Sequence, residues 1–273
     1  GGGARTGRIS SNPNVQNISK KLPLRVTGTL TLPDLRKLVA FHRAYGMRLV
    51  GADYAQQEMR ILAHFEQGAL MEAYLLDSRT HAHRMVLSIL RKMGIVLTYD
   101  EVKTAGFALL YGQGAPGTAI QLGCDIPRAR EVLRSYRKAL PGINKVINEL
   151  RQKAADNEPF ETWGGRIYHC EEPLVDAYGM LVQSYEYKMI NTEIQGSAAD
   201  HLKEAMLAYD EHPRREGELS ANAHDELLAL CEVGAVREEK KVLEQSMIEV
   251  GPFRGPMLAD AGSDLSWREA KAA

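Results

Sequence analysis

Residues Leu49–Arg60 read LVGADYAQQEMR, and this stretch predicts a strand that passes directly into a helix. The apolar run that begins at Leu49 ends on an acid, Asp53, and the residues after it have the periodicity of an amphipathic helix. A carboxylate at the end of a strand can hold Mg²⁺, a hard cation that takes oxygen ligands. Taken alone, Asp53 could equally be the N-cap of the following helix.

A second acidic stretch lies near the other end of the chain. Residues Ala221–Leu230 read ANAHDELLAL, two apolar runs that meet at His224 and Asp225, with Glu226 next. If this hairpin faces Asp53, the carboxylates could share two Mg²⁺ ions about 4 Å apart, which would stabilise the attacking and leaving oxygens of a phosphoryl transfer. The alternative is a polar hairpin turn that binds nothing.

A third stretch carries a cation and two aromatic rings at helical spacing. In KTAGFALLYG, Lys103, Phe107 and Tyr111 stand at i, i+4 and i+8, and Gly112 follows as a helix stop. One helix face would present them over about 12 Å, which suits a ligand with phosphates and a flat base. The alternative is a half-buried helix with a lysine reaching solvent. The apolar stripe expected to pack inward consists of Val102, Ala105 and Leu109.

These stretches, in this order, resemble the motifs of family A DNA polymerases of the bacterial polymerase I type, especially the phage members. The family's first motif is Asp-Tyr-Ser-Gln-Ile-Glu-Leu-Arg, and the matching residues here are Asp53, Tyr54, Gln56, Glu58 and Arg60. The chain departs from it at Ala55, Gln57 and Met59.

The other family motifs are also matched. The family's helix motif is met by Lys103, Phe107, Tyr111 and Gly112, and its His-Asp-Glu motif by 224–226. Three further stretches resemble family segments: the template-primer segment at Thr6–Ile18, the Thr-Trp-Gly-Gly-Arg sequence at Thr162–Arg166, and the helix start at Asn191–Asp200. The resemblance covers essentially the whole chain.

The resemblance implies a catalytic centre that uses two Mg²⁺ ions. Asp53 and Asp225 would bridge both ions, and Tyr54 would contribute its backbone carbonyl to one of them. Glu226 would support the site from beside Asp225, and Lys103 would neutralise charge that develops on the phosphates.

The resemblance also implies contacts to deoxynucleoside triphosphates and to primer-template DNA. Glu58, near Tyr111, would exclude a 2′-hydroxyl from the site. The remaining nucleotide-binding residues would be His83, Phe107, Tyr111, Tyr54 and Gln56. The residues expected to contact primer-template DNA are Arg8, Arg166, Asn191, Gln195 and His224.

The fold implied is α+β, with an antiparallel palm sheet interrupted by a helical fingers subdomain. We expect the palm at 1–60 and 176–273, and the fingers at 61–175 with a nucleotide-binding helix at 99–112. The thumb and the proofreading exonuclease are not expected in this chain. It is then a fragment, one half of a split polymerase that binds a separate thumb or exonuclease chain, or a partner-dependent subunit.

Periodicity and turn residues predict the individual elements. We expect a short helix around 33–45 and mostly helix over 58–155, broken at Gly94, Gly112–Gly117 and Pro141-Gly142. Hairpins are expected at 161–168 and 219–231. Further helices are expected at 175–190, 195–210 and 234–249. The G-x-G-x-x-G pattern at Gly112–Gly117 follows a helix, so it is interpreted as a helix stop and not a dinucleotide site.

Composition sets limits on the class of protein. The 273 residues are 44% apolar, enough for a sizeable core, and three scattered cysteines predict a reduced, cytoplasmic protein. No run approaches a membrane span, so no membrane partner is expected. The net charge of −1 argues mildly against nucleic acid as a partner, although charge distribution matters more than the sum. Two rival functions stay open. The expected lack of a thumb leaves a DNA-binding remnant without turnover, and the shared palm leaves a relative of single-subunit RNA polymerases, against which Glu58 argues.

One residue departs from the family in a way that bears on substrate affinity. The family has an arginine that binds the γ-phosphate four residues before the motif lysine, and this chain has Tyr99 there. We therefore expect weakened affinity for the triphosphate.

Overall fold

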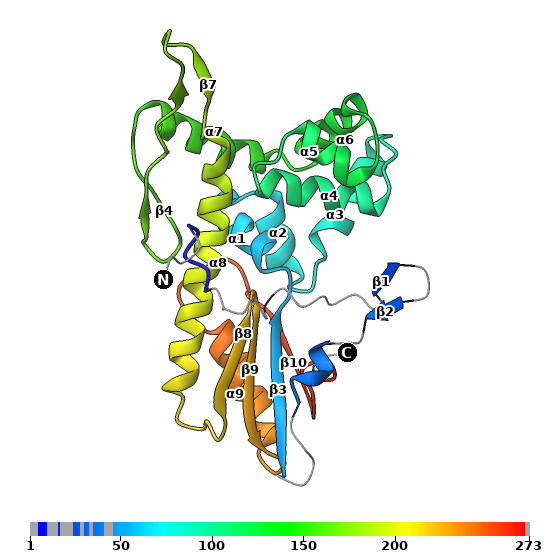
Figure 1. Cartoon of the computed structure of the whole chain (residues 1–273), viewed down its shortest axis with the longest axis vertical. Coiled ribbons are helices and arrows are strands. Elements are labelled where there is room, and N and C mark those ends of the chain that lie inside the picture. The colour runs from blue at the N-terminus through cyan, green and yellow to red at the C-terminus, as the bar shows by residue number, and fades with distance from the viewer. Residues whose placement is uncertain are drawn as a thin grey trace. The chain divides into compact units, whose positions relative to one another are not determined.

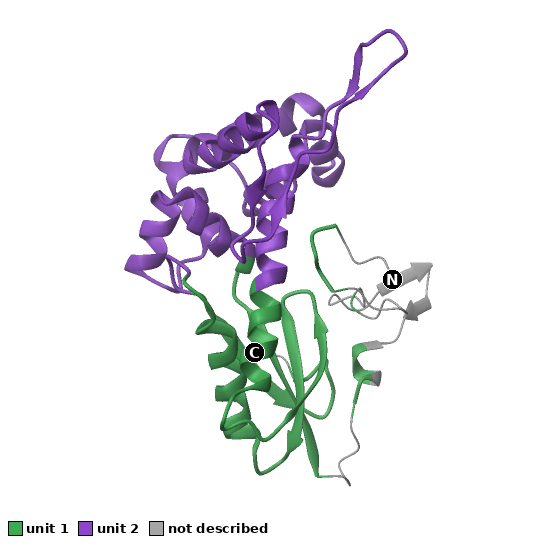
Figure 2. Ribbon diagram, turned by 90° about the vertical axis from the view of Figure 1, so that its left-hand side faces the viewer, with its two compact units in different colours: residues 1–57, 201–252, 257–273 green, residues 58–200, 253–256 purple. Residues whose placement is uncertain are grey.

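The structure is a computed structural model that describes residues 5–9, 16, 24–27, 30–32, 35–40 and 46–270. The chain divides into two compact units, coloured separately in Figure 2. Unit 1 consists of residues 1–57, 201–252 and 257–273, and unit 2 of residues 58–200 and 253–256. The first division is close to the limit predicted at residue 60, whereas the second lies well after the limit predicted at residue 175.

Unit 1 is built on a four-stranded antiparallel sheet in the order β10-β3-β9-β8 (Figure 1). Its strands are β3 (Met47–Tyr54), β8 (Glu218–Ala223), β9 (Glu226–Glu232) and β10 (Ala259–Asp264). In β3, Leu49, Val50 and Ala52 are fully buried, so both faces of this central strand are covered. Mixed helix and antiparallel sheet confirm the predicted α+β class.

The two faces of the sheet pack against different elements. Because side chains alternate along a strand, Val50 and Tyr54 face helix α9 (Val236–Ile248), where the hydroxyl of Tyr54 donates to the carbonyl of Met247. Leu49 and Asp53 point to the other face, where Leu49 packs in a cluster with Ala223, Leu228, Trp267 and Ala270.

A glycine on this second face allows close packing. A Cβ on Gly51 would lie 3.0 Å from Cδ2 of Leu228 and 3.3 Å from the carbonyl oxygen of Ala270. The neighbouring strand and the C-terminal turn can therefore approach β3 only because position 51 has no side chain.

The N-terminal part of unit 1 is described only in pieces. β1 (Leu24–Thr27) and β2 (Leu30–Leu32) pair antiparallel, and Leu35–Leu38 forms a 3₁₀ turn. That turn is all the helix described within the predicted 33–45, of which 33, 34 and 41–45 lie outside the described residues. Of the predicted template-primer segment, 10–15, 17 and 18 also lie outside them.

Unit 2 is mainly helical, with one large apolar core. Its helices in chain order are α1 (Gln57–Glu66), α2 (Ala69–Leu76), α3 (Ala82–Lys92), α4 (Tyr99–Leu110), α5 (Ala115–Leu122), α6 (Ile126–Ala139), α7 (Gly142–Ala155) and the first part of α8 (Tyr187–Asp210). These bounds confirm the predicted helical region and its breaks. The predicted inward stripe of α4 is buried throughout. Among the described residues, every helix is too short or too polar to span a membrane.

Both ends of α4 follow from local chemistry. Thr98 and Glu101 form a capping box at its start, in which each side chain accepts a hydrogen bond from the other's backbone N–H. At its end Gly112 adopts φ +65°, and a Cβ there would lie 1.8 Å from the carbonyl oxygen of Tyr187. The glycine is therefore required twice, by backbone conformation and by space, which confirms the interpretation of this segment as a helix stop.

The helix predicted at 175–190 is wrong. Residues 174–183 form a hairpin of β6 (Leu174–Val175) and β7 (Leu181–Gln183), and α8 begins only at Tyr187 and continues without a break to Asp210. The carboxylate of Asp176 accepts from the backbone N–H groups of Tyr178 and Met180, and Gly179 has φ +76°, so turn chemistry overrides helical periodicity here.

The other predicted elements have the expected type. The hairpin of β4 (Phe160–Glu161) and β5 (Ile167–Tyr168) confirms the prediction for 161–168. β8 and β9 confirm the hairpin at 219–231, and α9 confirms the last helix. β10 was not expected, since its sequence ADAGSD carries no β-branched residue.

Candidate active site

The acidic residues of unit 1 meet at one end of the sheet. In the β3–β9 pairing Asp53 lies opposite Glu226, and the N–H of Tyr54 donates to the carbonyl of Asp225 at 3.1 Å. Asp225 occupies a two-residue turn with His224, whose φ is +59°. Asp53 lies within β3, which excludes its alternative interpretation as the N-cap of α1. The two aspartates therefore come from neighbouring strand ends, although 53 and 225 are far apart in the chain.

The side chain of Tyr54 is buried in the core of unit 1. Its ring is 4% exposed, lies 4.9 Å from the ring of His201, and its hydroxyl donates to the carbonyl of Met247 at 2.9 Å. Burial raises the pKa of this hydroxyl well above its ordinary value. The phenol is thus neutral and points away from Asp53, so only the backbone carbonyl of Tyr54 remains as an oxygen ligand.

Glu226 is a buried carboxylate with partners on the same face as Asp53. Its Oε1 accepts from Nε1 of Trp267 at 3.0 Å, and its Oε2 lies 3.5 Å from the guanidinium of Arg36. That guanidinium stacks over the indole of Trp267, 3.9 Å from the ring centroid. Glu226 therefore anchors the end of β9 to two distant segments. The sequence contained no signal for Arg36 or Trp267, because neither lies in a recognisable motif.

A second buried pair supports the start of α1. Nε2 of Gln57 lies 3.4 Å from Nδ1 of His201, and the histidine is fully buried. Burial lowers the pKa of His201 to about 4, so its ring is neutral at physiological pH. The sequence carries no signal for a role of His201, because a single histidine within a helix is most often a packed core residue.

The donor set of unit 1 fits Mg²⁺. Asp53 and Asp225 offer carboxylate oxygens, and Tyr54 offers a carbonyl, which are the ligand types that this cation prefers. Within the described residues, no group of three or more His, Cys, Asp or Glu side chains could hold a metal by itself. Mg²⁺ normally completes its shell with water and substrate oxygens, so two carboxylates and a carbonyl suffice.

Unit 2 presents an aromatic and basic surface along α3 and α4. The ring of Phe107 lies 5.8 Å from that of Tyr111 and 5.5 Å from that of His83. The hydroxyl of Tyr111 donates to Oε2 of Glu58 at 3.0 Å. Lys103 is exposed on the same helix. The structure thus brings together the nucleotide-binding residues predicted for this unit.

Two histidines stand beside this surface. His83 is 3% exposed, and its Nδ1 has no hydrogen-bond partner among the described residues. Burial first, and then the charges of His81 and Lys103, lower the pKa of His83 to about 4. Nε2 of His81 lies 3.3 Å from the hydroxyl of Tyr99, the residue that replaces the family arginine. At physiological pH His83 can therefore act only as a neutral hydrogen-bonding group.

The residues predicted to contact DNA are in varied environments. Asn191 and Gln195 lie one turn apart on α8 and are partly exposed, and His224 is exposed on its turn. Arg8 is partly exposed within the short described segment 5–9. Arg166 pairs with Asp200, and its Nη1 donates to the hydroxyl of Tyr168 at 3.1 Å, so its guanidinium is already held within unit 2.

The comparison with protein families identifies the chain. A family model described as DNA polymerase family A matches residues 2–269. The chain belongs to this family. The match includes the acidic strand end, α4 and the β8–β9 turn.

Relatives of known function support this assignment. The chain is 30% identical over 278 residues to DNA polymerase I of Pseudomonas aeruginosa, covering 98% of this chain and 29% of the relative. It is 32% identical over 259 residues to DNA polymerase I of Chloroflexus aurantiacus, covering 91% and 26%. The chain thus spans less than a third of the length of these relatives. They are bacterial, and the phage type of this chain stays a prediction.

A solved structure has the same fold. It is the POL domain of Pol1 from M. smegmatis in complex with DNA primer-template and dNTP, with a TM-score of 0.78 and 28% identity. The match covers 98% of this chain and 47% of that one.

Proposed function

We propose that this chain is the palm and fingers portion of a template-directed DNA polymerase, with its palm at 1–60 and 176–273 and its fingers at 61–175. In this proposal it adds deoxynucleotides to the 3′ end of a primer and releases pyrophosphate during DNA replication. The observation that carries the proposal is the pairing of β3 with β9, which sets Asp53 beside the turn that bears Asp225. The M. smegmatis structure, a complex with primer-template and dNTP, supports the choice of substrates.

The acidic end of the sheet would bind the cations. The carboxylates of Asp53 and Asp225 and the carbonyl of Tyr54 would hold two Mg²⁺ ions. When bound, these ions lower the pKa of the primer hydroxyl and neutralise charge on the triphosphate. Glu226 would act as a positioning residue, because its contacts with Trp267 and Arg36 fix the strand end beside Asp225.

The surface on α3 and α4 would bind the incoming nucleotide. Lys103 would neutralise the phosphates and could give a proton to the leaving pyrophosphate. Phe107 would pack on the base, His83 would donate to a phosphate oxygen as a neutral imidazole, and Tyr111 would stand at the template-base position. The bond from Tyr111 to Glu58 would hold the carboxylate where a 2′-hydroxyl would clash with it.

The remaining site residues would contact the nucleic acid or shape the strand end. Gln56, with φ +58°, lies between β3 and α1 and would contact the nucleotide. Contacts to the primer-template minor groove, which read acceptors shared by all correct pairs, would come from Arg8, Arg166, Asn191, Gln195 and His224.

A primer-extension assay tests the proposal. The purified chain would receive a primed template, Mg²⁺ and either deoxy- or ribonucleotides, with Asp225→Ala as the inactive variant. Deoxynucleotide extension that the variant loses supports the proposal. Binding of primer-template without extension would instead support a partner-dependent fragment, and equal use of ribonucleotides would contradict the proposed substrate class.

A further inference from the structure

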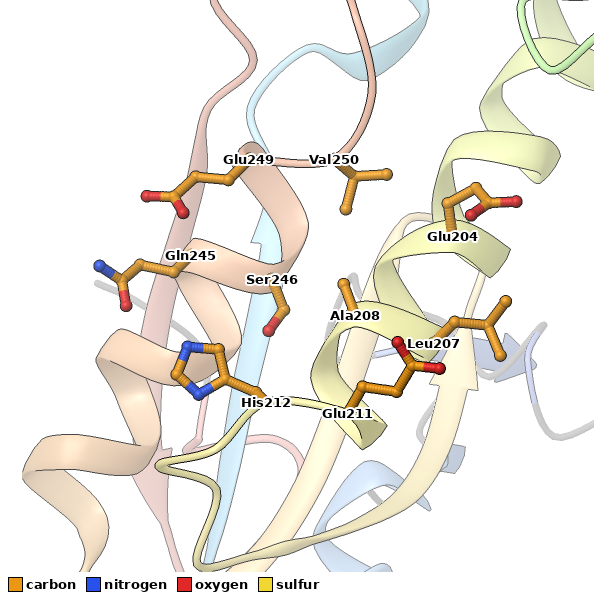
Figure 3. A pocket seen from close by; sticks show the side chains of 9 residues that line it. All are labelled: Glu204, Leu207, Ala208, Glu211, His212, Gln245, Ser246, Glu249 and Val250. Carbon is orange, nitrogen blue, oxygen red and sulfur yellow. The ribbon is translucent and has the colours of Figure 1, made fainter.

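A cavity between the C-terminal ends of α8 and α9 lies within unit 1 and involves none of the proposed polymerase residues. Its volume is about 500 Å³, within the range of small-molecule sites. It is lined by Glu204, Leu207, Ala208, Glu211, His212, Gln245, Ser246, Glu249 and Val250, shown in Figure 3. We call this cavity the α8–α9 pocket.

The buried part of the pocket contains a polar group that the protein leaves without a hydrogen bond. Ser246 is 4% exposed, and its Oγ has no hydrogen-bond partner among the described residues. Figure 3 shows this side chain directed from α9 toward α8, with Ala208 across from it. A buried hydroxyl without a partner destabilises the protein, so a ligand that bonds to it would gain affinity from that bond.

The rim of the pocket is acidic. Glu204, Glu211 and Glu249 are all exposed, and none of them forms an ion pair with a described residue. The lining residues, all from the described part of the chain, include no lysine or arginine. Arg214 bonds to Gln245 from outside the lining, and its charge is balanced by Glu238 at 2.6 Å.

The backbone adds to this negative potential. α8 ends at Asp210 and α9 at Ile248, so the pocket lies at two helix C-termini. Each C-terminus carries roughly half a negative charge from its unpaired carbonyl groups, which stabilises cations placed close to it. Three carboxylates and two helix ends therefore favour a ligand with several positive charges.

The spacing of the charges and the apolar wall narrow the ligand further. Glu204 on α8 and Glu211, the first residue after α8, stand seven residues apart, which is two helical turns or about 10 Å along the helix axis. Between them Leu207 and Ala208 offer an apolar surface, with Val250 from the end of α9. This arrangement is complementary to a flexible aliphatic chain with ammonium groups at both ends. His212 also lines the pocket. Its Nδ1 accepts from the N–H of Arg214, so in the neutral ring the proton is on Nε2.

We propose that the α8–α9 pocket binds a linear aliphatic polyamine, with its ammonium groups at Glu204, Glu211 and Glu249 and with one N–H donating to Oγ of Ser246. The binding requires no DNA and no metal, so it is independent of the proposed polymerase reaction. The same alkylammonium chemistry occurs in lysine side chains, and the test separates these two sources.

The test is calorimetric titration of the whole chain, without DNA, using spermidine, putrescine, butylamine and a lysine-containing tripeptide as probes. We expect saturable one-to-one binding of spermidine, whose outer ammonium groups lie far enough apart to reach both Glu204 and Glu211. Putrescine and butylamine should bind at least tenfold more weakly. Equal affinity for the monoamine would contradict the proposal, and tighter binding of the tripeptide would show that the pocket takes a lysine side chain instead.

Charge-matched variants locate the binding. Glu204→Gln combined with Glu211→Gln should weaken spermidine binding at least tenfold. The control pair, Glu218→Gln with Glu232→Gln, removes the same charge from exposed positions on β8 and β9 and should leave the affinity within twofold. Equal loss in both pairs would mean nonspecific attraction to an acidic surface and would overturn the proposal.

A third variant tests the buried hydroxyl. Ser246→Ala keeps the pocket and all charges, and it should weaken spermidine binding severalfold with no loss of melting temperature. If Ser246→Ala binds spermidine as tightly as the wild type, Oγ of Ser246 does not contact the ligand, which would contradict the proposal.

Discussion

The strand end in unit 1 and the α3–α4 surface in unit 2 hold their functional groups in different ways. In unit 1 the positions of Asp53 and Asp225 follow from backbone hydrogen bonds between β3 and β9 and from a buried carboxylate beside them. In unit 2, Lys103 and Tyr111 are exposed side chains on one helix. The difference matches the two proposed tasks: cation ligands must be fixed to within fractions of an ångström, whereas contacts to a nucleotide can adjust on binding.

Two buried glutamates extend this comparison. Glu226 in unit 1 has a guanidinium and an indole N–H as partners. Glu193 in unit 2 is 7% exposed, and its Oε2 has no hydrogen-bond partner among the described residues, so burial raises its pKa to about 8. The two glutamates therefore differ in their surroundings: Glu226 lies beside a cation, whereas Glu193 keeps its proton at neutral pH.

The largest effect is expected at the strand end of unit 1. Asp225→Asn should reduce primer extension by about a thousandfold or more, because it removes a carboxylate that holds the cations. The melting temperature should change little, since the substitution keeps the carbonyl of residue 225 that accepts from the N–H of Tyr54. Single-turnover extension measures the effect, with Glu232→Gln at the opposite end of β9 as control. Retained activity in the Asp225 variant would overturn the proposed site.

Removing the buried carboxylate of unit 1 should cost stability. Glu226→Ala removes the carboxylate that pairs with the buried guanidinium of Arg36 and accepts from Nε1 of Trp267, so we expect a loss of about 3 kcal/mol. Urea unfolding followed by circular dichroism measures it, and Glu232→Ala, exposed on the same strand, is the control. A loss no larger than the control's would mean that Glu226 does not anchor the strand.

The buried carboxyl of unit 2 should make stability depend on pH in a defined direction. The pKa of Glu193 is about 8 in the folded chain and near its ordinary value of 4.5 when unfolded. The folded state therefore keeps a proton that the unfolded state releases, and stability falls as pH rises from about 4.5 to 8. Glu193→Gln should remove this contribution and stabilise the chain at pH 8 by up to about 4 kcal/mol.

Melting curves at several pH values would measure this difference. The exposed substitution Glu158→Gln is the control, and it should leave the pH dependence as it is in the wild type. If the Glu193 variant loses as much stability between pH 5 and 8 as the wild type, Glu193 does not hold its proton in the folded state.

The contact between Tyr111 and Glu58 should govern sugar selection. Glu58→Ala should raise the kcat/KM for ribonucleotides relative to deoxynucleotides by about tenfold or more, because the blocking carboxylate is gone. Tyr111→Phe removes only the hydrogen bond that orients the carboxylate and should have a smaller effect in the same direction. Unchanged selectivity in both variants would exclude Glu58 from sugar selection.

The smallest effect is expected at Tyr99. Tyr99→Arg adds an exposed cation near the proposed phosphate contacts and should lower the KM for deoxynucleotides by about two- to fivefold. Tyr99→Phe is the control, since it removes the contact with His81 without adding charge. No lowering of KM by the arginine would mean that the departure from the family at this position does not weaken triphosphate binding.

Features that depend on local physics could be predicted from the order of the amino acids alone. The end of β3 at an acid, the His224-Asp225 turn and the exposed face of α4 were all predictable, since alternation, helical periodicity and capping act over a few residues. The helical region from α1 to α7, its breaks at Gly94, Gly112 and Pro141, and two of the hairpins follow from the same rules, whereas the breaks at 67–68, 77–81 and 123–125 were not predicted. The family motifs supplied the order of the parts and the expected site residues.

Features that depend on contacts between distant segments became visible only in the folded chain. The Arg36 and Trp267 partners of Glu226, the pairing of β10 with β3, and the α8–α9 pocket each join segments far apart in the chain. Neither the hydrophobic pattern nor the turn residues predict these long-range contacts. Whether a buried charge has an ion-pair partner depends on the segments that pack around it in the folded chain. In the same way, the segment ADAGSD forms an edge strand because β3 is available to pair with it.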